Sequence, residues 1–208
     1  MEFKSPPFKF TNKISKNKMK KTLLIALLLI PFIGISQTTK PIDGFLGIKF
    51  GSSKADVIAA MKAKGGVLEQ GGTENRIFFD NIKLGHRDVD FVQVDLFGDK
   101  AYSASLAFKP ENEASTLGFY DSLVSDISGA YGSGKPTIYF KAPYKYGDGN
   151  ETTALSLSEG DMYTDWHSDA KTIEIYITTK LKVVLLYMDD TLHAQAKAAE
   201  KAKEKSDF

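Results

Sequence analysis

The chain has 208 residues, of which 42% are hydrophobic and 25% charged, and its formal net charge is +1. It contains no cysteine. That absence excludes a disulfide scaffold, a cysteine-ligated zinc or iron–sulfur site, a cysteine nucleophile and a lipid anchor carried on cysteine.

Residues 19–37, MKKTLLIALLLIPFIGISQ, predict a secretory signal peptide. Two lysines precede an apolar run of 14 residues. The small residues Gly34 and Ser36 stand at the two positions that a signal peptidase reads, which predicts cleavage between Ser36 and Gln37. A membrane-spanning helix needs about 20 apolar residues, so a removed signal is the favoured interpretation. We therefore predict a signal segment 1–36 with an over-long start, a true start at Met19, and a periplasmic or secreted mature chain without a membrane anchor.

Removal of residues 1–36 changes the charge balance. The segment holds seven lysines and one glutamate, so the mature chain keeps 20 of 27 basic and 25 of 26 acidic residues, a net charge of −5. A chain with this balance and no stripe of basic residues lacks the electrostatic footprint of nucleic-acid binding.

The remaining sequence predicts strands and helices in alternation. We expect a strand over 45–50, a helix over 53–64, strands over 76–84, 90–97 and 100–109, a helix over 110–131, a strand over 137–142, an irregular segment 143–169, strands over 171–179 and 182–188, and a polar helix thereafter. Gly98-Asp99 is typical of a tight hairpin turn. Runs of antiparallel strands with interspersed helices favour an α+β fold.

The predicted architecture is a mainly antiparallel α+β domain over 37–188, made of meanders and hairpins with two packed helices. Residues 189–208 form a polar C-terminal helix or tail. Residues 45–109 and 113–188 share a similar order of elements, which predicts a pseudo-repeat without clear identity between the residues.

Two glycine-containing segments resemble phosphate loops but are better explained structurally. In GSSK, residues 51–54, Ser53 is a good helix N-cap with Asp56 three residues later. In GAYGSGKP, residues 129–136, proline stands where a phosphate loop needs serine or threonine, and the loop leaves a helix instead of entering one. We predict no cofactor, and no metal site, because no histidine pair has a ligand spacing.

Aromatic residues gather in the segment after residue 138. Exposed aromatic side chains on loops are frequent where proteins bind partners or sugars, although they also anchor long loops. The candidate binding residues are Tyr139, Tyr144, Tyr146, Tyr163, Trp166 and His167. These residues favour a non-enzymatic binding or assembly role in the cell envelope, with an unknown envelope protein or a small ligand as the partner.

An enzyme is the alternative. His167 lies between Asp165 and Asp169, which permits a hydrolase of envelope carbohydrate or peptide that uses these carboxylates. No nucleophile elbow is present, and carboxylate pairs work only at separations in space that a sequence does not give. No catalytic residue is therefore predicted.

The ending GISQ, the segment FLGIKFGSSKADVIAAM, the AYG before Pro136 and the tryptophan before a closing hairpin resemble uncharacterised small exported proteins of Bacteroidetes-type bacteria. A helix that leads into an antiparallel meander is also similar to the envelope proteins of the BamE kind. The first resemblance implies an exported α+β protein, and neither implies a role for any residue.

Overall fold

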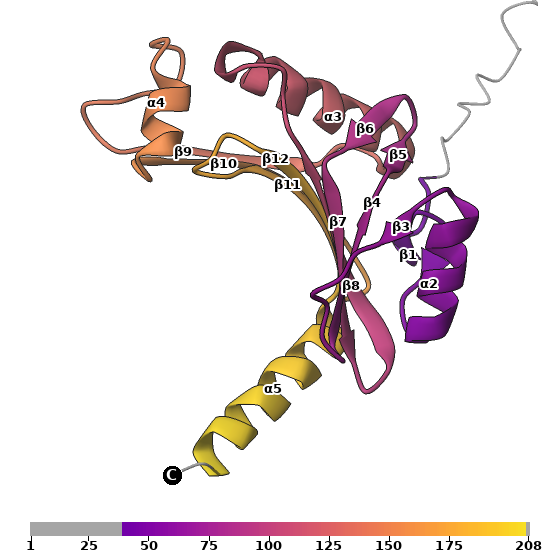
Figure 1. Ribbon diagram of the computed structural model, residues 1–208. Coiled ribbons are helices and arrows are strands. Elements are labelled where there is room, and N and C mark those ends of the chain that lie inside the picture. The colour runs from indigo at the N-terminus through magenta and orange to yellow at the C-terminus, as the bar shows by residue number, and fades with distance from the viewer. Residues whose placement is uncertain (1–38, 207–208) are drawn as a thin grey trace, which may run out of the picture. The chain divides into compact units, whose positions relative to one another are not determined.

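The computed structural model describes the backbone of residues 39–206 and the side chains of residues 39–205. The predicted signal segment, with its cleavage site between Ser36 and Gln37, lies outside the described residues. The fold is α+β, with an eight-stranded antiparallel sheet and a few helices, as the sequence predicted (Figure 1).

The elements are, in chain order, β1 Gly44–Phe45, β2 Ile48–Lys49, α2 Lys54–Ala63, β3 Val67–Leu68, β4 Arg76–Asp80, β5 Ile82–Leu84, β6 Arg87–Val89, β7 Phe91–Phe97, β8 Lys100–Phe108, the 3-10 turn Glu113–Ser115, α3 Thr116–Tyr131, β9 Lys135–Phe140, α4 Glu151–Ser156, β10 Gly160–Ser168, β11 Lys171–Ile177, β12 Val183–Asp189 and α5 Asp190–Ser206. Among the described residues, no helix is both long and apolar enough to cross a membrane.

The large sheet consists of two meanders that meet in its middle. Its strand order is β3-β4-β7-β8-β12-β11-β10-β9. The first strand of each half, β3 or β9, lies at an edge of the sheet, and the last strands, β8 and β12, pair with each other at its centre. Each half is also preceded by a helix, α2 before β3 and α3 before β9. Both halves thus consist of a helix followed by four strands of the large sheet, with β5–β6 inserted in the first half and α4 in the second, while a shared origin of the halves stays a prediction.

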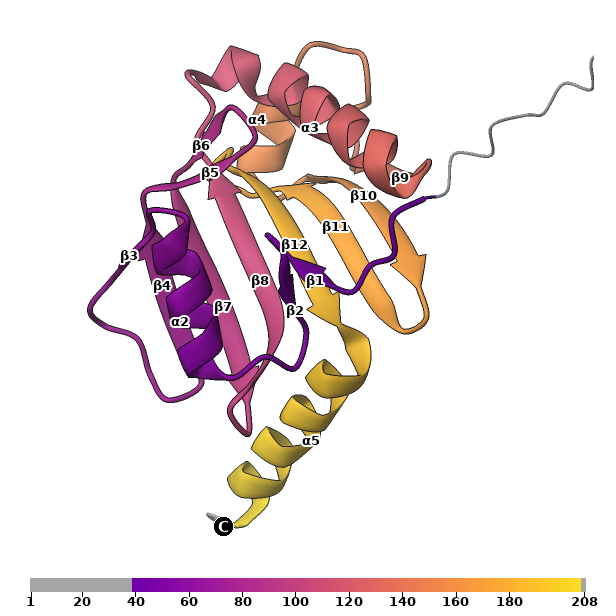
Figure 2. The same cartoon turned by 90° about the vertical axis from the view of Figure 1, so that its right-hand side faces the viewer.

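Successive side chains of a strand point to opposite faces of the sheet, so one set of side chains from each strand lies in the core. Leu106 of β8, Leu185 of β12 and Ile175 of β11 lie in register across the sheet, and all three are fully buried. The helices α2 and α3 cover this face; Met61 and Leu123, both also fully buried, come from them (Figure 2). Burying such a side chain stabilises the fold by about 1.5–3 kcal/mol.

The N-terminal end of α2 confirms the helix-start interpretation of GSSK. The Ser53 hydroxyl accepts a hydrogen bond of 3.2 Å from the backbone N–H of Asp56. The Nζ of Lys54 donates to the carbonyl oxygens of Thr73 and Glu74 at 2.9 and 3.3 Å, so this lysine is occupied by the protein itself. The segment 129–136 leaves α3 and enters β9, which is the order of elements that the sequence predicted.

Three predicted elements were wrong. The single strand expected over 76–84 is divided at Asn81, which has a positive φ, into β4 of the large sheet and β5 of a two-stranded sheet. The strand expected over 45–50 is the small hairpin β1–β2, because Leu46 and Gly47 both have positive φ and turn the chain. The segment expected to be irregular, 143–169, contains α4 and all of β10.

The strand β10 escaped prediction because a polar residue interrupts its buried positions. Thr164 lies between Met162 and Trp166 on the covered face, and it is only 2% exposed. Its hydroxyl forms a 2.7 Å hydrogen bond with the Tyr120 hydroxyl of α3, which satisfies both groups in the core. A pattern of apolar residues alone does not reveal such a pair.

Candidate functional site

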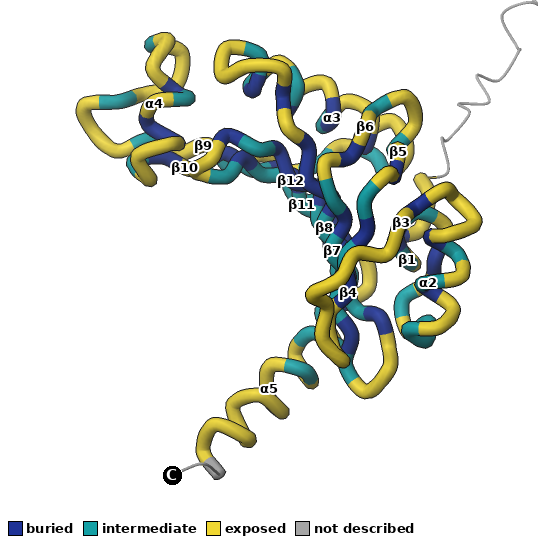
Figure 3. The backbone as a smooth tube through the Cα atoms, in the orientation of Figure 1, coloured by how far each residue is buried: buried dark blue, intermediate teal, exposed yellow. Residues whose placement is uncertain are grey.

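One face of the large sheet is covered by a helix only at one end, where α5 contacts it. The helices α2 and α3 and the small hairpins lie on its convex side, whereas the concave side faces outward and has α5 at one end (Figures 1 and 2). Residues of intermediate exposure follow this concave side along the central strands (Figure 3). We call this surface the open face.

The registers of the strand pairs identify the side chains on the open face. They are Arg76 and Phe78 of β4, Phe91, Gln93 and Asp95 of β7, Tyr102, Ser103, Ser105 and Ala107 of β8, Val184, Leu186 and Met188 of β12, Thr172, Glu174 and Tyr176 of β11, Asp161, Tyr163, Asp165 and His167 of β10, and Lys135, Thr137 and Tyr139 of β9.

An apolar and aromatic row crosses the open face. Phe91 is paired with Ala107, which is paired with Val184; Val184 is paired with Tyr176, and Tyr176 with Tyr163. The row therefore runs over five neighbouring strands. Aromatic side chains supply large contact areas at low cost in conformational entropy, and they are enriched in the buried centres of protein interfaces.

A carboxylate pair lies beside the two tyrosines. Glu174 of β11 is the cross-strand partner of Asp165 of β10, just as Tyr176 is the partner of Tyr163. Burial, followed by the negative charge of Asp165, raises the pKa of Glu174 above its usual value, and His167 acts in the opposite direction. Burial and then the charge of Glu174 likewise raise the pKa of the Tyr176 hydroxyl. Glu174, Asp165, His167 and Tyr176 therefore form one electrostatically connected group.

The next rung of the ladder consists of His167 and Thr172, which are cross-strand partners. The His167 Nε2 lies 2.7 Å from Asp165 Oδ2, and its Nδ1 lies 2.9 Å from the Thr172 hydroxyl. That hydroxyl donates a 2.9 Å hydrogen bond to the Asp190 carboxylate at the start of α5. The chain of contacts links β10 and β11 to α5.

This arrangement does not resemble a hydrolytic centre. Both imidazole nitrogens of His167 face protein oxygen atoms, and the hydroxyl beside its Nδ1 is not an accessible nucleophile. Thr172 is 6% exposed, and its proton points to Asp190. Among the described residues, the Asp169 side chain makes no hydrogen bond or ion pair with His167. In the same part of the chain, no group of three or more acidic or histidine side chains is arranged to hold a metal ion.

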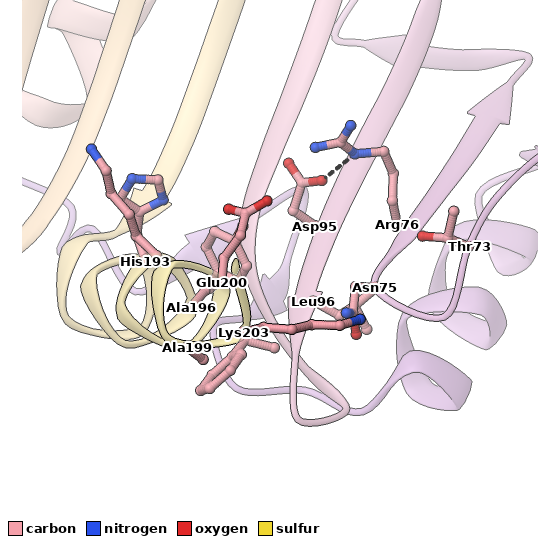
Figure 4. A pocket seen from close by; sticks show the side chains of 13 residues that line it. Thr73, Asn75, Arg76, Asp95, Leu96, His193, Ala196, Ala199, Glu200 and Lys203 are labelled. Carbon is pink, nitrogen blue, oxygen red and sulfur yellow. Dashed lines mark hydrogen bonds and ion pairs between the residues drawn. The ribbon is translucent and has the colours of Figure 1, made fainter. Parts of the chain in front are cut away.

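Two hollows adjoin the open face. A cavity of about 640 Å³ separates α5 from β4 and β7; Arg76 and Asp95 form an ion pair on its strand side, and His193, Glu200 and Lys203 stand on its helix side (Figure 4). A second cavity, of about 480 Å³, lies where β10 extends past β9, and Lys135, Asp165 and His167 are among its lining residues. Each hollow carries charges of both signs.

The predicted site residues separate into three groups. Tyr139, Tyr163 and His167 lie on the open face. Trp166 points to the opposite face, is 4% exposed and donates its Nε1–H to the Gly132 carbonyl at 2.8 Å. Tyr144 and Tyr146 belong to the connection between β9 and α4. Burial is the main cause that raises the pKa of the Tyr120 hydroxyl on α3, and Tyr146 adds to it, so Tyr146 lies in the neighbourhood of α3.

Sequence reasoning missed Glu174, Tyr176 and Leu186 of the open face. The strand TIEIYI contained the signal, because its three isoleucines alternate with Glu174 and Tyr176, which therefore point to the opposite face of the sheet. The isoleucines predicted the strand, but no role was predicted for the two residues between them. Comparison of the chain with protein-family models, curated proteins and solved structures gives no match. The argument for function therefore depends on the geometry of the site.

Proposed function

We propose that this protein is an exported, non-enzymatic binding protein of the cell envelope, and that it holds a protein partner against the open face. The observation that carries the proposal is a curved sheet whose concave face has a helix only at one end (Figure 1) and carries the partly exposed aromatic residues Phe91, Tyr176 and Tyr163. The signal-like segment 19–37 supports export to the periplasm or beyond.

The size of the open face favours a macromolecular partner. Eight strands at a spacing of ~4.8 Å give a width of about 34 Å, and strands of about seven residues give a length of about 23 Å. The resulting area of about 800 Å² equals the contribution of one partner to a standard protein–protein interface. A hydrolase is less favoured, because the hydroxyl beside His167 belongs to the buried Thr172 and donates its proton to Asp190.

Site-specific photo-crosslinking tests the proposal. A photoreactive phenylalanine analogue is placed at Tyr176 or Leu186 of the tagged protein in its own host, and at Tyr146 as the control, because Tyr146 is 60% exposed and lies off the open face. We expect one protein of defined mass to be cross-linked from Tyr176 and Leu186 but not from Tyr146. Equal cross-linking from Tyr146, or none from the open face, would contradict the proposal.

A further inference from the structure

Glu174 is a half-buried carboxylate that has no ion-pair partner and no hydrogen-bond donor among the described residues; only the more distant His167 acts on it as a positive charge. The residue is neither fully buried nor fully exposed to solvent. By contrast, Asp95 of the same face is bound to Arg76 at 2.6 Å and to Gln93 at 3.0 Å, and Asp165 is bound to His167. Partly buried charges are normally paired, so an unpaired one on a candidate interface calls for an external partner.

The neighbours of Glu174 are arranged around a position for a positive group. Asp165 flanks it on β10, Leu186 flanks it on β12, and Tyr176 follows two residues along β11 on the same face. The one basic residue in this row is Lys135, the partner of Asp165 on β9, and the ion pairs among the described residues include none between Lys135 and either acid. Glu174 thus stands beside apolar and aromatic surface without an ion-pair partner, and its neighbour Asp165 is bound only to the imidazole of His167.

A lysine or arginine side chain has the chemistry that this position requires. Its aliphatic stem packs on apolar surface while its head remains polar, and its charge is attracted to the face of a tyrosine ring. A hydrated metal ion would instead need six or more oxygen ligands, and Leu186 and Tyr176 supply none that are suited to it. We propose, building on the proposed function, that the protein partner inserts a lysine or arginine between Leu186 and Tyr176 to pair with Glu174 and Asp165.

A random peptide library, displayed on phage and selected on the immobilised protein, tests this proposal. We expect the selected peptides to share a lysine or arginine next to apolar residues. Their affinity is expected to fall about tenfold with Glu174→Gln, because a desolvated charge pair is lost, and to fall with rising salt. Glu174→Lys is expected to reverse the preference, so that selection yields acidic peptides.

The control variant is Asp88→Asn, which removes one negative charge from the exposed β5–β6 hairpin away from the open face. It should leave the affinity of the basic peptides unchanged. Peptides that need Tyr163 and Tyr176 but carry no basic residue would overturn this inference and leave the proposed function intact. Peptides whose binding survives Tyr163→Ser with Tyr176→Ser would overturn both.

Discussion

At the scale of single residues, Trp166 has a structural role instead of the binding role that the sequence predicted. It is 4% exposed, and its Nε1–H is satisfied by the Gly132 carbonyl. Gly134 packs so closely against the indole that a Cβ at that position would lie 2.5 Å from the ring. The side chain thus fixes the connection between α3 and β9 against the sheet.

We expect Trp166→Phe to lower the free energy of unfolding by about 1–2 kcal/mol through the lost hydrogen bond, and Trp166→Ala to lower it by about 3–5 kcal/mol through the cavity left behind. Urea unfolding followed by circular dichroism measures both values. Tyr139→Ala serves as the control, because Tyr139 is 57% exposed and its removal should change stability little. A stability of Trp166→Ala equal to that of the wild type would contradict the structural role.

Glu174 makes the folded state sensitive to pH. Its pKa is raised from 4.5, first by burial and then by Asp165, while His167 lowers it and Lys135 is the other charged side chain in its row. The folded state therefore binds more protons than the unfolded state just above 4.5, so the contribution of Glu174 to stability falls as the pH rises through that window.

Glu174→Gln removes this titration. We expect the variant to be more stable than the wild type at neutral pH, and the difference to disappear below a pH of about 4, where the carboxyl is protonated in both states. Thermal unfolding across this range measures the effect. A difference that is constant with pH would mean that the substitution acts through packing and not through charge.

At the scale of elements, α2 depends on its N-cap. The Ser53 hydroxyl accepts a hydrogen bond from the backbone N–H of Asp56, and no other described side chain accepts from that N–H. We expect Ser53→Ala to lower the free energy of unfolding by about 1 kcal/mol, and Ser53→Asn to restore most of the loss, because asparagine is an equally good cap and adds no negative charge beside the Asp56 carboxylate, which lies 2.7 Å from the Ser53 hydroxyl. Urea unfolding of the three proteins gives the comparison; a Ser53→Asn variant no more stable than Ser53→Ala would exclude capping as the cause.

At the scale of the whole molecule, β12 joins the two halves of the sheet. Leu185 of this strand is fully buried, and it is in register with Leu106 on one side and Ile175 on the other. A core that is continuous across this junction should unfold as one cooperative unit.

We therefore expect Leu185→Ala to lower the free energy of unfolding by about 2–5 kcal/mol while the transition stays single. Fluorescence of the only tryptophan reports on the β9–β12 half, and circular dichroism reports on the whole chain. Two separated midpoints would show that the halves are independent folding units. Coincident midpoints support a single domain.

The sequence predicted the parts of the fold that depend on local periodicity. The hairpin β7–β8 with its Gly98-Asp99 turn, the helix α2, the C-terminal end of α3, and the strands β11 and β12 lie close to their predicted bounds, whereas α3 begins at Thr116 and not at residue 110. Residues 143–169 were misread, because α4 has only six residues and the buried Thr164 of β10 is polar until Tyr120 is placed beside it. Of the six candidate binding residues, the strand registers bring Tyr139, Tyr163 and His167 to one face.

The sequence by itself determined the class of fold, the absence of cysteine chemistry, the ends of the main helices and the alternation within most strands. Each of these depends on residues that are near one another in the chain. Only the tertiary structure decided that β8 pairs with β12, that one face has a helix only at one end, and that Glu174 stands beside Asp165 and Tyr176 beside Tyr163. Alternation shows that a strand has two sides, but the pairing of distant strands depends on how the whole chain buries its apolar surface.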